Sequence, residues 1–286
     1  MKKGLRIGGV PEHFNLPWTL AIADDAFAAT GVDVEFVDYP GGTGAMNAAL
    51  QNGDLDAALV LTEGAVLDIL GGSNNRLVST YVDSPLIWGI HVAASSDIHD
   101  VADIKGKRIA ISRYGSGSHL IAAVDAAERG FPTDDLQFVV VDNIDGARAA
   151  LANHNADVFL WEKHMTQPLV DSGEFRRVGE RIVPWPAFVV SVRADYLDGH
   201  QADISSVLEI VARYAAEFHS GSKSAELVSE TYDISVADAQ SWLSDVTWNE
   251  DHRYPAAAMA RVVSALGSQG LLESSNFEPD DIWRKL

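Results

Sequence analysis

The chemistry of this chain is most visible in a short loop, Gly41-Gly42-Thr43-Gly44, which stands between an alternating segment and an amphipathic one. Three glycines allow the backbone to approach a ligand closely, and N–H groups at the start of a helix form an anion site. Thr43 adds a hydroxyl group. The loop lacks the spacing and the lysine of a Walker sequence and also lacks the spacing of a dinucleotide fingerprint. It predicts an anion-binding turn, and a plain tight turn is the alternative interpretation.

A second loop of the same kind runs from Ser112 to His119, after an expected strand over 108–111 and before an expected helix over 120–129. Its glycines, its hydroxyl groups and its place before a helix give it the same capacity for anions. The residues expected to contact a ligand here are Ser112, Gly115, Ser116, Gly117 and Ser118. Two such loops, facing each other across a cleft, would hold a carboxylate, sulfonate or phosphate without any arginine. A Ser/Gly helix cap is the alternative interpretation.

Polar and aromatic residues follow several of the expected strands or lie in the expected connection between the two halves. Ligands bind outside the carboxyl ends of strands in open parallel sheets, and aromatic walls with a few placed polar groups are typical of ligand sites. These positions complete the predicted ligand site: Phe14, Asn15, Trp18, Thr62, Glu63, Trp88, Trp161 and Glu162. For each tryptophan, packing in the core or in a hinge is the alternative interpretation.

The sequence offers few residues for catalysis. The chain has nine histidines but no HxH, HxxxH or HExxH spacing, so no metal site is expected. Gly115-Ser116-Gly117 lacks the outer spacing of a GxSxG nucleophile elbow. The absence of cysteine excludes disulfides, thiol catalysis and thiolate metal sites. We therefore expect no catalytic residue, no metal and no cofactor.

Length and charge restrict the classes of partner. The chain has 286 residues, 47% of them hydrophobic, and a net charge of −20. This acidity disfavours nucleic acid, whose phosphates need a basic patch. The N-terminus MKKGLRIGGVPEHF lacks the hydrophobic segment of a signal peptide, and no stretch reaches the length of a membrane span. We expect a cytoplasmic monomer that binds a small molecule, or a periplasmic or cell-surface one if a leader has been removed.

Strands alternate with helices along the chain, which predicts a parallel α/β architecture. The first expected elements are strands over 5–10, 32–39 and 57–61 and helices over 15–29 and 45–51. Apolar, strand-like segments over 85–95 and 186–192 are expected to carry the chain between two lobes. The helices expected after them, which should pack on the first lobe, cover 204–220, 224–231, 236–243 and 256–269. The predicted lobes are 1–89 plus 190–286 for lobe one and 90–189 for lobe two.

An internal repeat supports the two-lobed interpretation. Segments 34–63 and 136–162 share the order strand, glycine-containing turn, helix, short strand and Glu-bearing loop. The matched pairs are Phe36 with Phe138, Leu50 with Leu151, Asn52 with Asn153, Asp56 with Asp157 and Glu63 with Glu162. A period of about 100 residues is too long for a solenoid. We interpret the repeat as two lobes of similar plan; the general likeness of any two βαβ units is the alternative.

Five tracts of the chain resemble the sulfonate-, nitrate- and thiamine-precursor-binding proteins of ABC importers. They are LRIGG, AFAATGVDVEF, GGTGAMNAALQNGDLDAAL, VADIKGKRIAISRYGSGSH and AALANHNADVFLWEKH. The resemblance implies a type II periplasmic-binding-protein fold, a Venus flytrap whose lobes are mixed sheets flanked by helices. Such lobes close on a small anionic or zwitterionic ligand, sulfonate-like or heterocyclic. The positions that match the family's ligand residues are Asn15, Thr43, Thr62, Ser112, Ser116 and Trp161.

This resemblance leaves three functions open. The first is a solute-binding protein, with an ABC permease as partner if the protein is exported, although the PEHF start and the GGTG loop also look like a soluble subgroup without export signals. The second is a cytoplasmic enzyme on the same scaffold, with Glu63 or Glu162 as acid or base. The third is a ligand sensor. The thiamine-pyrimidine synthases of this fold use a cysteine-rich motif, and the chain has neither cysteine nor the motifs of the menaquinone-pathway enzymes. We therefore expect a binding protein and not an enzyme.

Overall fold

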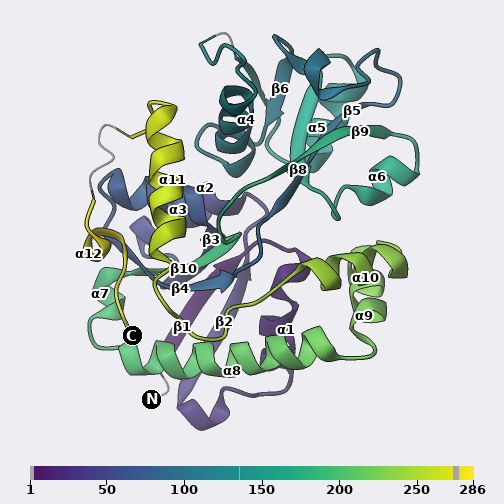
Figure 1. Ribbon diagram of the computed structural model, residues 1–286. Coiled ribbons are helices and arrows are strands. Elements are labelled where there is room, and N and C mark those ends of the chain that lie inside the picture. The colour runs from purple at the N-terminus through teal and green to yellow at the C-terminus, as the bar shows by residue number, and fades with distance from the viewer. Residues whose placement is uncertain (1–2, 135, 273–276) are drawn as a thin grey trace.

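The computed structural model describes residues 3–134, 136–272 and 277–286, and these form two separate five-stranded mixed sheets flanked by helices (Figure 1). The first sheet, in the order β2-β1-β3-β10-β4, contains β1 (Lys3–Gly9), β2 (Val32–Asp38), β3 (Ala57–Leu61), β4 (Asn75–Val82) and β10 (Phe188–Arg193). The second, in the order β7-β6-β8-β5-β9, contains β5 (Ile87–Ala93), β6 (Arg108–Ile111), β7 (Gln137–Val140), β8 (Val158–Glu162) and β9 (Phe175–Ile182). The predicted α/β class with two lobes is confirmed.

The helices divide between the two sheets. In Figure 1, α4, α5 and α6 lie with the second sheet, whereas α1, α8, α9 and α10 lie with the first. The bounds are α1 (Leu16–Ala23), α2 (Gly42–Asn52), α3 (Thr62–Leu70), α4 (Gly117–Glu128), α5 (Ile144–Ala152), α6 (Gln167–Asp171), α7 (Ala194–Leu197), α8 (Gln201–Ser220), α9 (Ser224–Tyr232), α10 (Val236–Asp245), α11 (Ala256–Ser268) and α12 (Pro279–Ile282). As expected, α8 packs on α1 and α11 on α3, and α11 also reaches α4 of the other half. Of the helices described, none is long and apolar enough to cross a membrane.

An arginine–aspartate pair in each sheet marks the internal repeat. In the first sheet, the backbone N–H and Nε of Arg6 donate to Asp56 Oδ2 at 2.9 and 3.1 Å, and Nη2 donates to Oδ1 at 2.9 Å. In the second, Arg108 makes the same three bonds to Asp157 at 2.9, 3.0 and 2.8 Å. In each pair the aspartate directly precedes the strand that runs parallel beside the strand of its arginine. The predicted match of Asp56 with Asp157 is therefore confirmed.

One pair of the predicted repeat is wrong. Counted from the equivalent aspartates, Glu162 at the end of β8 occupies the place of Leu61 at the end of β3. The parallel registers agree, because Ile7 pairs with Ala57 in one sheet and Ile109 with Val158 in the other. Glu63 lies in the first turn of α3. Glu63 and Glu162 therefore do not occupy equivalent positions in the two halves of the repeat.

Several elements differ from the sequence-based expectations. The helix expected to end at Ala29 ends at Ala23, because Asp25 has a φ of 53°, a left-handed conformation that a helix cannot contain. The helix expected from Ala45 begins at Gly42, so the glycine-rich loop supplies its first turn. The sequence analysis does not predict α3, β4 or β9. Thr62 enters α3 directly from β3, with no turn residue to signal the change.

Two short segments, 83–86 and 183–187, connect the sheets. The strands before residue 83 and after residue 187 belong to the first sheet, and those between belong to the second. The lobe boundaries at 89/90 and 189/190 stay a prediction. The main hydrophobic core contains side chains of both halves, including Leu61 and Trp88. The two lobes are therefore in contact where their sheets approach each other.

Candidate functional site

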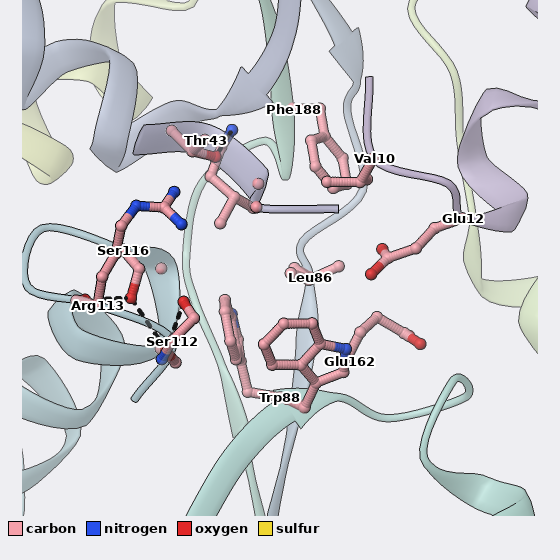
Figure 2. Close-up of a pocket in the computed structure, with 16 residues that line it drawn as sticks. Val10, Glu12, Thr43, Leu86, Trp88, Ser112, Arg113, Ser116, Glu162 and Phe188 are labelled. Atoms are coloured by element: carbon pink, nitrogen blue, oxygen red, sulfur yellow. Dashed lines mark hydrogen bonds between the residues drawn. The ribbon is translucent and has the colours of Figure 1, made fainter. Parts of the chain in front are cut away.

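A cavity lies between the two sheets, at the carboxyl ends of their parallel strands (Figure 2). The space between its walls is about 500 Å³, counting the part that opens to solvent. Both halves of the chain contribute its lining, which consists of Val10, Glu12, Gly41, Gly42, Thr43, Leu61, Leu86, Trp88, Ser112, Arg113, Ser116, Gly117, Ser118, Trp161, Glu162 and Phe188. The two glycine-rich loops of the sequence analysis thus face one cavity.

The first turns of α2 and α4 form one end of this cavity. Backbone N–H groups in a first turn have no intrahelical acceptor, and the positive end of the helix dipole attracts anions. The hydroxyl groups beside them are held by the chain itself: the Leu61 N–H donates to Thr43 Oγ1 at 3.0 Å, and the Ser112 N–H donates to Ser118 Oγ at 3.0 Å. Ser116 Oγ donates to the Arg113 carbonyl at 2.7 Å. These bonds fix both loops in shape before any ligand arrives.

Arg113 adds a guanidinium group to the same end, which the sequence analysis did not expect. The side chain packs on α2, because a Cβ built on Gly44 would lie 2.9 Å from its Nε and Nη2. Its Nη2 is buried without a hydrogen-bond partner, and it forms no ion pair with any described carboxylate. Burial lowers the pKa of Arg113. A cation is thus held against the positive end of α2 with nothing to neutralise it.

Aromatic side chains form the middle of the cavity. Trp88 from β5 and Phe188 from β10 lie on opposite sides of it in Figure 2, with Leu86 between them. The Trp88 ring also approaches α4, where a Cβ on Gly117 would lie 2.9 Å from Cη2 and would collide with Leu61. Trp88 is only 4% exposed, and its Nε1 has no partner among the described residues. The middle of the cavity therefore combines flat apolar walls with one unused N–H donor.

Two glutamates form the opposite end. Figure 2 shows Glu12 and Glu162 together on the side of the cavity away from Arg113. The Met165 N–H donates to Glu162 Oε2 at 2.6 Å, and His13 Nε2 lies 3.6 Å from the same oxygen. Burial alone would raise the pKa of Glu162, but the hydrogen bond and charge of His13, with smaller contributions from His164 and Met165, lower it. Burial, followed by the charge of Glu162, raises the pKa of Glu12 to about 8.

Seven predicted site residues do not line the cavity: Phe14, Asn15, Trp18, Gly44, Thr62, Glu63 and Gly115. Trp18 is fully buried against Phe27, Phe36 and Tyr81 in the core of the first half. Asn15 supports the lining through Val10, whereas Phe14 and Thr62 form hydrogen bonds with residues outside it. The carbonyl of Phe14 accepts from Tyr81 and Trp248, Asn15 Nδ2 donates to the Val10 carbonyl, and Thr62 Oγ1 donates to the Pro186 carbonyl. Over the ranges that the structure describes, no three histidine or acidic side chains meet as metal ligands.

Glu63 is buried in the first turn of α3 and contacts the connection between the sheets. Trp185 Nε1 donates to Glu63 Oε2 at 2.9 Å, and Oε1 is buried without a partner. Burial raises the pKa of Glu63 to about 7. The carboxyl group is therefore a deeply buried acid without a cation, but it has no surface on the cavity through which it could act on a ligand.

Replacing Glu63 by glutamine should change the free energy of unfolding differently at two pH values. The change at pH 8 should be about 2 kcal/mol more stabilising than the change at pH 5. The folded chain retains the Glu63 proton up to about pH 7, whereas the unfolded chain releases it near the ordinary value of 4.5. The stability therefore falls as the pH rises from 4.5 to about 7 and is constant above that range. The glutamine removes this loss, and its amide oxygen can still accept the hydrogen bond from Trp185. Urea unfolding at both pH values measures it, with the exposed Glu209→Gln as control. Equal effects of Glu63→Gln at pH 5 and 8 would contradict the assignment.

Comparisons with known proteins agree with this architecture. A family model described as "Ca3427-like PBP" matches residues 88–181. The Candida albicans CA3427 gene product, whose structure has the generic periplasmic-binding-protein fold, is 27% identical, with a TM-score of 0.88 over 96% of this chain and 92% of that one. No curated protein matches the chain.

Two alkanesulfonate-binding proteins have the same fold at lower identity. SsuA from Xanthomonas axonopodis pv. citri, bound to MOPS, is 18% identical, with a TM-score of 0.84 over 99% of this chain and 98% of that one. SsuA from Escherichia coli is 20% identical, with a TM-score of 0.75 over the same shares. The resemblance found in the sequence to type II periplasmic-binding-protein-like proteins is confirmed in the fold.

Proposed function

We propose that this chain, which has the type II periplasmic-binding-protein fold, is a solute-binding protein whose two lobes close on one small anionic ligand and release it unchanged. The observation that carries the proposal is Arg113, a half-buried arginine at the cavity whose Nη2 is buried without a partner and whose guanidinium packs on the N-terminal turn of α2. An anion between the two positive groups would neutralise both. Charge-assisted hydrogen bonds from guanidinium, hydroxyl and helix N–H groups are the donors that sulfonates, phosphates and carboxylates require.

The relatives support this class of ligand. The SsuA structures are of proteins named for alkanesulfonate or aliphatic sulphonate binding, and one holds MOPS, itself a sulfonate. We propose a sulfonate or similarly compact anion for this chain, with an ABC permease as the downstream partner if the protein is exported. In the cytoplasm the same monomer would act as a ligand sensor.

An enzymatic role is less well supported by the two glutamates named for it. Glu63 has no surface on the cavity. Glu162 does line it, but the Met165 N–H and His13 hold it in its ionised form, so it is a poor proton donor near neutral pH. Hydrogen-bonded carboxylates at a cavity edge are typical of recognition.

Titration with ethanesulfonate or MOPS should reduce the radius of gyration, and the compound should be recovered unchanged. The cavity has walls from both sheets, so a ligand that contacts both walls favours the closed arrangement. Small-angle scattering measures the compaction, and mass spectrometry measures the recovery. Saturation without compaction would contradict the hinge, and steady conversion of the compound would contradict the binding role.

A further inference from the structure

We propose that the ligand is zwitterionic: its anionic group binds at Arg113, and an ammonium or similar N–H cation binds between Glu12 and Glu162. This inference rests on the proposed anion-binding function and adds a second subsite to the same cavity. Glu12 and Glu162 lie together at the end of the cavity away from Arg113.

Closure places two carboxylates from different lobes on one side of the cavity. Glu12 follows β1 of the first sheet, and Glu162 is the last residue of β8 in the second. Both line the cavity, and Figure 2 shows them close together. Like charges that approach in a poorly solvated space repel strongly. The pair avoids this repulsion because Glu12 holds its proton, its pKa being raised to about 8 by burial and by the charge of Glu162. A cation between them would release that proton and make charge-assisted contacts with both carboxylates, so a ligand cation would favour the closed arrangement.

The described part of the chain supplies little positive charge to this pair. Neither carboxylate forms an ion pair with a lysine or an arginine there. His13 lies 3.6 Å from Glu162 Oε2, and Arg177 acts on Glu162 only from beyond ion-pair distance. The other titratable neighbours are His164 and His91, whose pKa values are lowered by burial, and Tyr232. Burial and the charge of Glu162 together raise the pKa of Glu12. The pair therefore lacks a counter-ion that the protein could provide for both members.

The unused Trp88 N–H is an independent sign that a polar ligand spans the cavity. Trp88 is nine-tenths buried, its Nε1 has no partner among the described residues, and its ring lies between the two charged ends. A buried donor without an acceptor is unfavourable. The same situation occurs at Arg113 Nη2. The unsatisfied donors at Arg113 and Trp88, together with the two glutamates at the other end, fit one ligand with an anion, a flat or apolar body and a cation.

Matched pairs of compounds test the second subsite separately from the first. Ethane-, propane- and butanesulfonate carry only the anion, and their ω-amino counterparts add a terminal ammonium. Calorimetry on the full chain should find at least one amino compound bound at least about tenfold more tightly than its parent. In Glu12→Gln the amino compounds should lose this advantage over their parent compounds. The matched control is Glu209→Gln, which removes the same charge from the exposed face of α8 and should retain the advantage.

The outcomes separate the two proposals. Equal affinity within every pair would overturn the zwitterion inference and leave the anion site intact, because His13 would then already neutralise the glutamates. An advantage that persists in Glu12→Gln and in Glu162→Gln would also overturn it. Failure of both series to bind would overturn the anion proposal, and the zwitterion inference with it. Tighter binding of the amino compounds alone, accompanied by release of a proton from the protein, would support the assignment of Glu12. Calorimetry in buffers of different ionisation enthalpy measures that proton release.

Discussion

Replacing Arg113 by methionine should weaken the binding of ethanesulfonate or MOPS by about 100-fold. The guanidinium lines the cavity, its Nη2 lacks a partner, and a charge-assisted hydrogen bond contributes roughly 1.5–3 kcal/mol, where about 1.4 kcal/mol is tenfold. Methionine retains an apolar stem to pack on Gly44. The free energy of unfolding without ligand should not fall, because the variant removes a half-buried cation that has no acidic partner.

Isothermal calorimetry and urea unfolding measure these two results. The control is Arg148→Met, which removes an exposed arginine paired with Glu174 and should leave the affinity unchanged. An Arg113→Met protein that binds the sulfonate within about threefold of the original would show that the helix termini hold the anion alone, as the sequence analysis expected.

Replacing Gly117 by valine should weaken the binding of ethanesulfonate or MOPS by more than about 100-fold, with the fold preserved. Gly117 begins α4, and a Cβ there would collide with Leu61 of the first sheet and lie 2.9 Å from Trp88 Cη2. A branched side chain would therefore hold α4 away from β3. The lobes could not close over the cavity, and the anion would lose the donors of one wall.

Calorimetry and small-angle scattering together test this prediction, since the variant should fail to compact at high ligand concentration. Gly130→Ala, at the other end of α4, is the control: its φ is 73°, and a Cβ there meets no atom within 4 Å. The control should be slightly destabilised and should bind normally. Normal compaction of Gly117→Val would mean that Leu61 moves aside and that the contact is unimportant.

Much of the fold was predictable because local patterns encode it. Alternating strands, glycine stops and the repeated Asp56 and Asp157 indicate two similar α/β units in the sequence alone. Strand β9 was missed because FRRVGERI is an edge strand that pairs with β5 alone, and its charged side chains hide the alternation. Helix α3 was missed because it follows β3 without a turn.

The candidate site was predictable in part. Both glycine-rich loops line the cavity because a strand, a glycine loop and a helix N-terminus are consecutive in sequence and therefore fixed by local geometry. Arg113 lies within the second of those loops in the sequence, but the neighbouring residues do not show that it lacks an acidic partner in the folded chain. The approach of Glu12 to Glu162 depends on the closure of two lobes. Trp18 was indistinguishable by pattern from a cavity-facing residue, since a short apolar helix gives no contrast between its faces.

The position of β10 has a consequence for how the chain is synthesised. This strand lies between β3 and β4, yet it follows them by more than a hundred residues. When residue 182 leaves the ribosome, every strand of the second sheet has been synthesised, whereas the first sheet still lacks β10. The second sheet can thus form on the nascent chain while β3 and β4 keep facing edges unpaired. Closing that gap requires the segment that ends at Arg193, so the sheet containing the N-terminus is the later of the two to be completed.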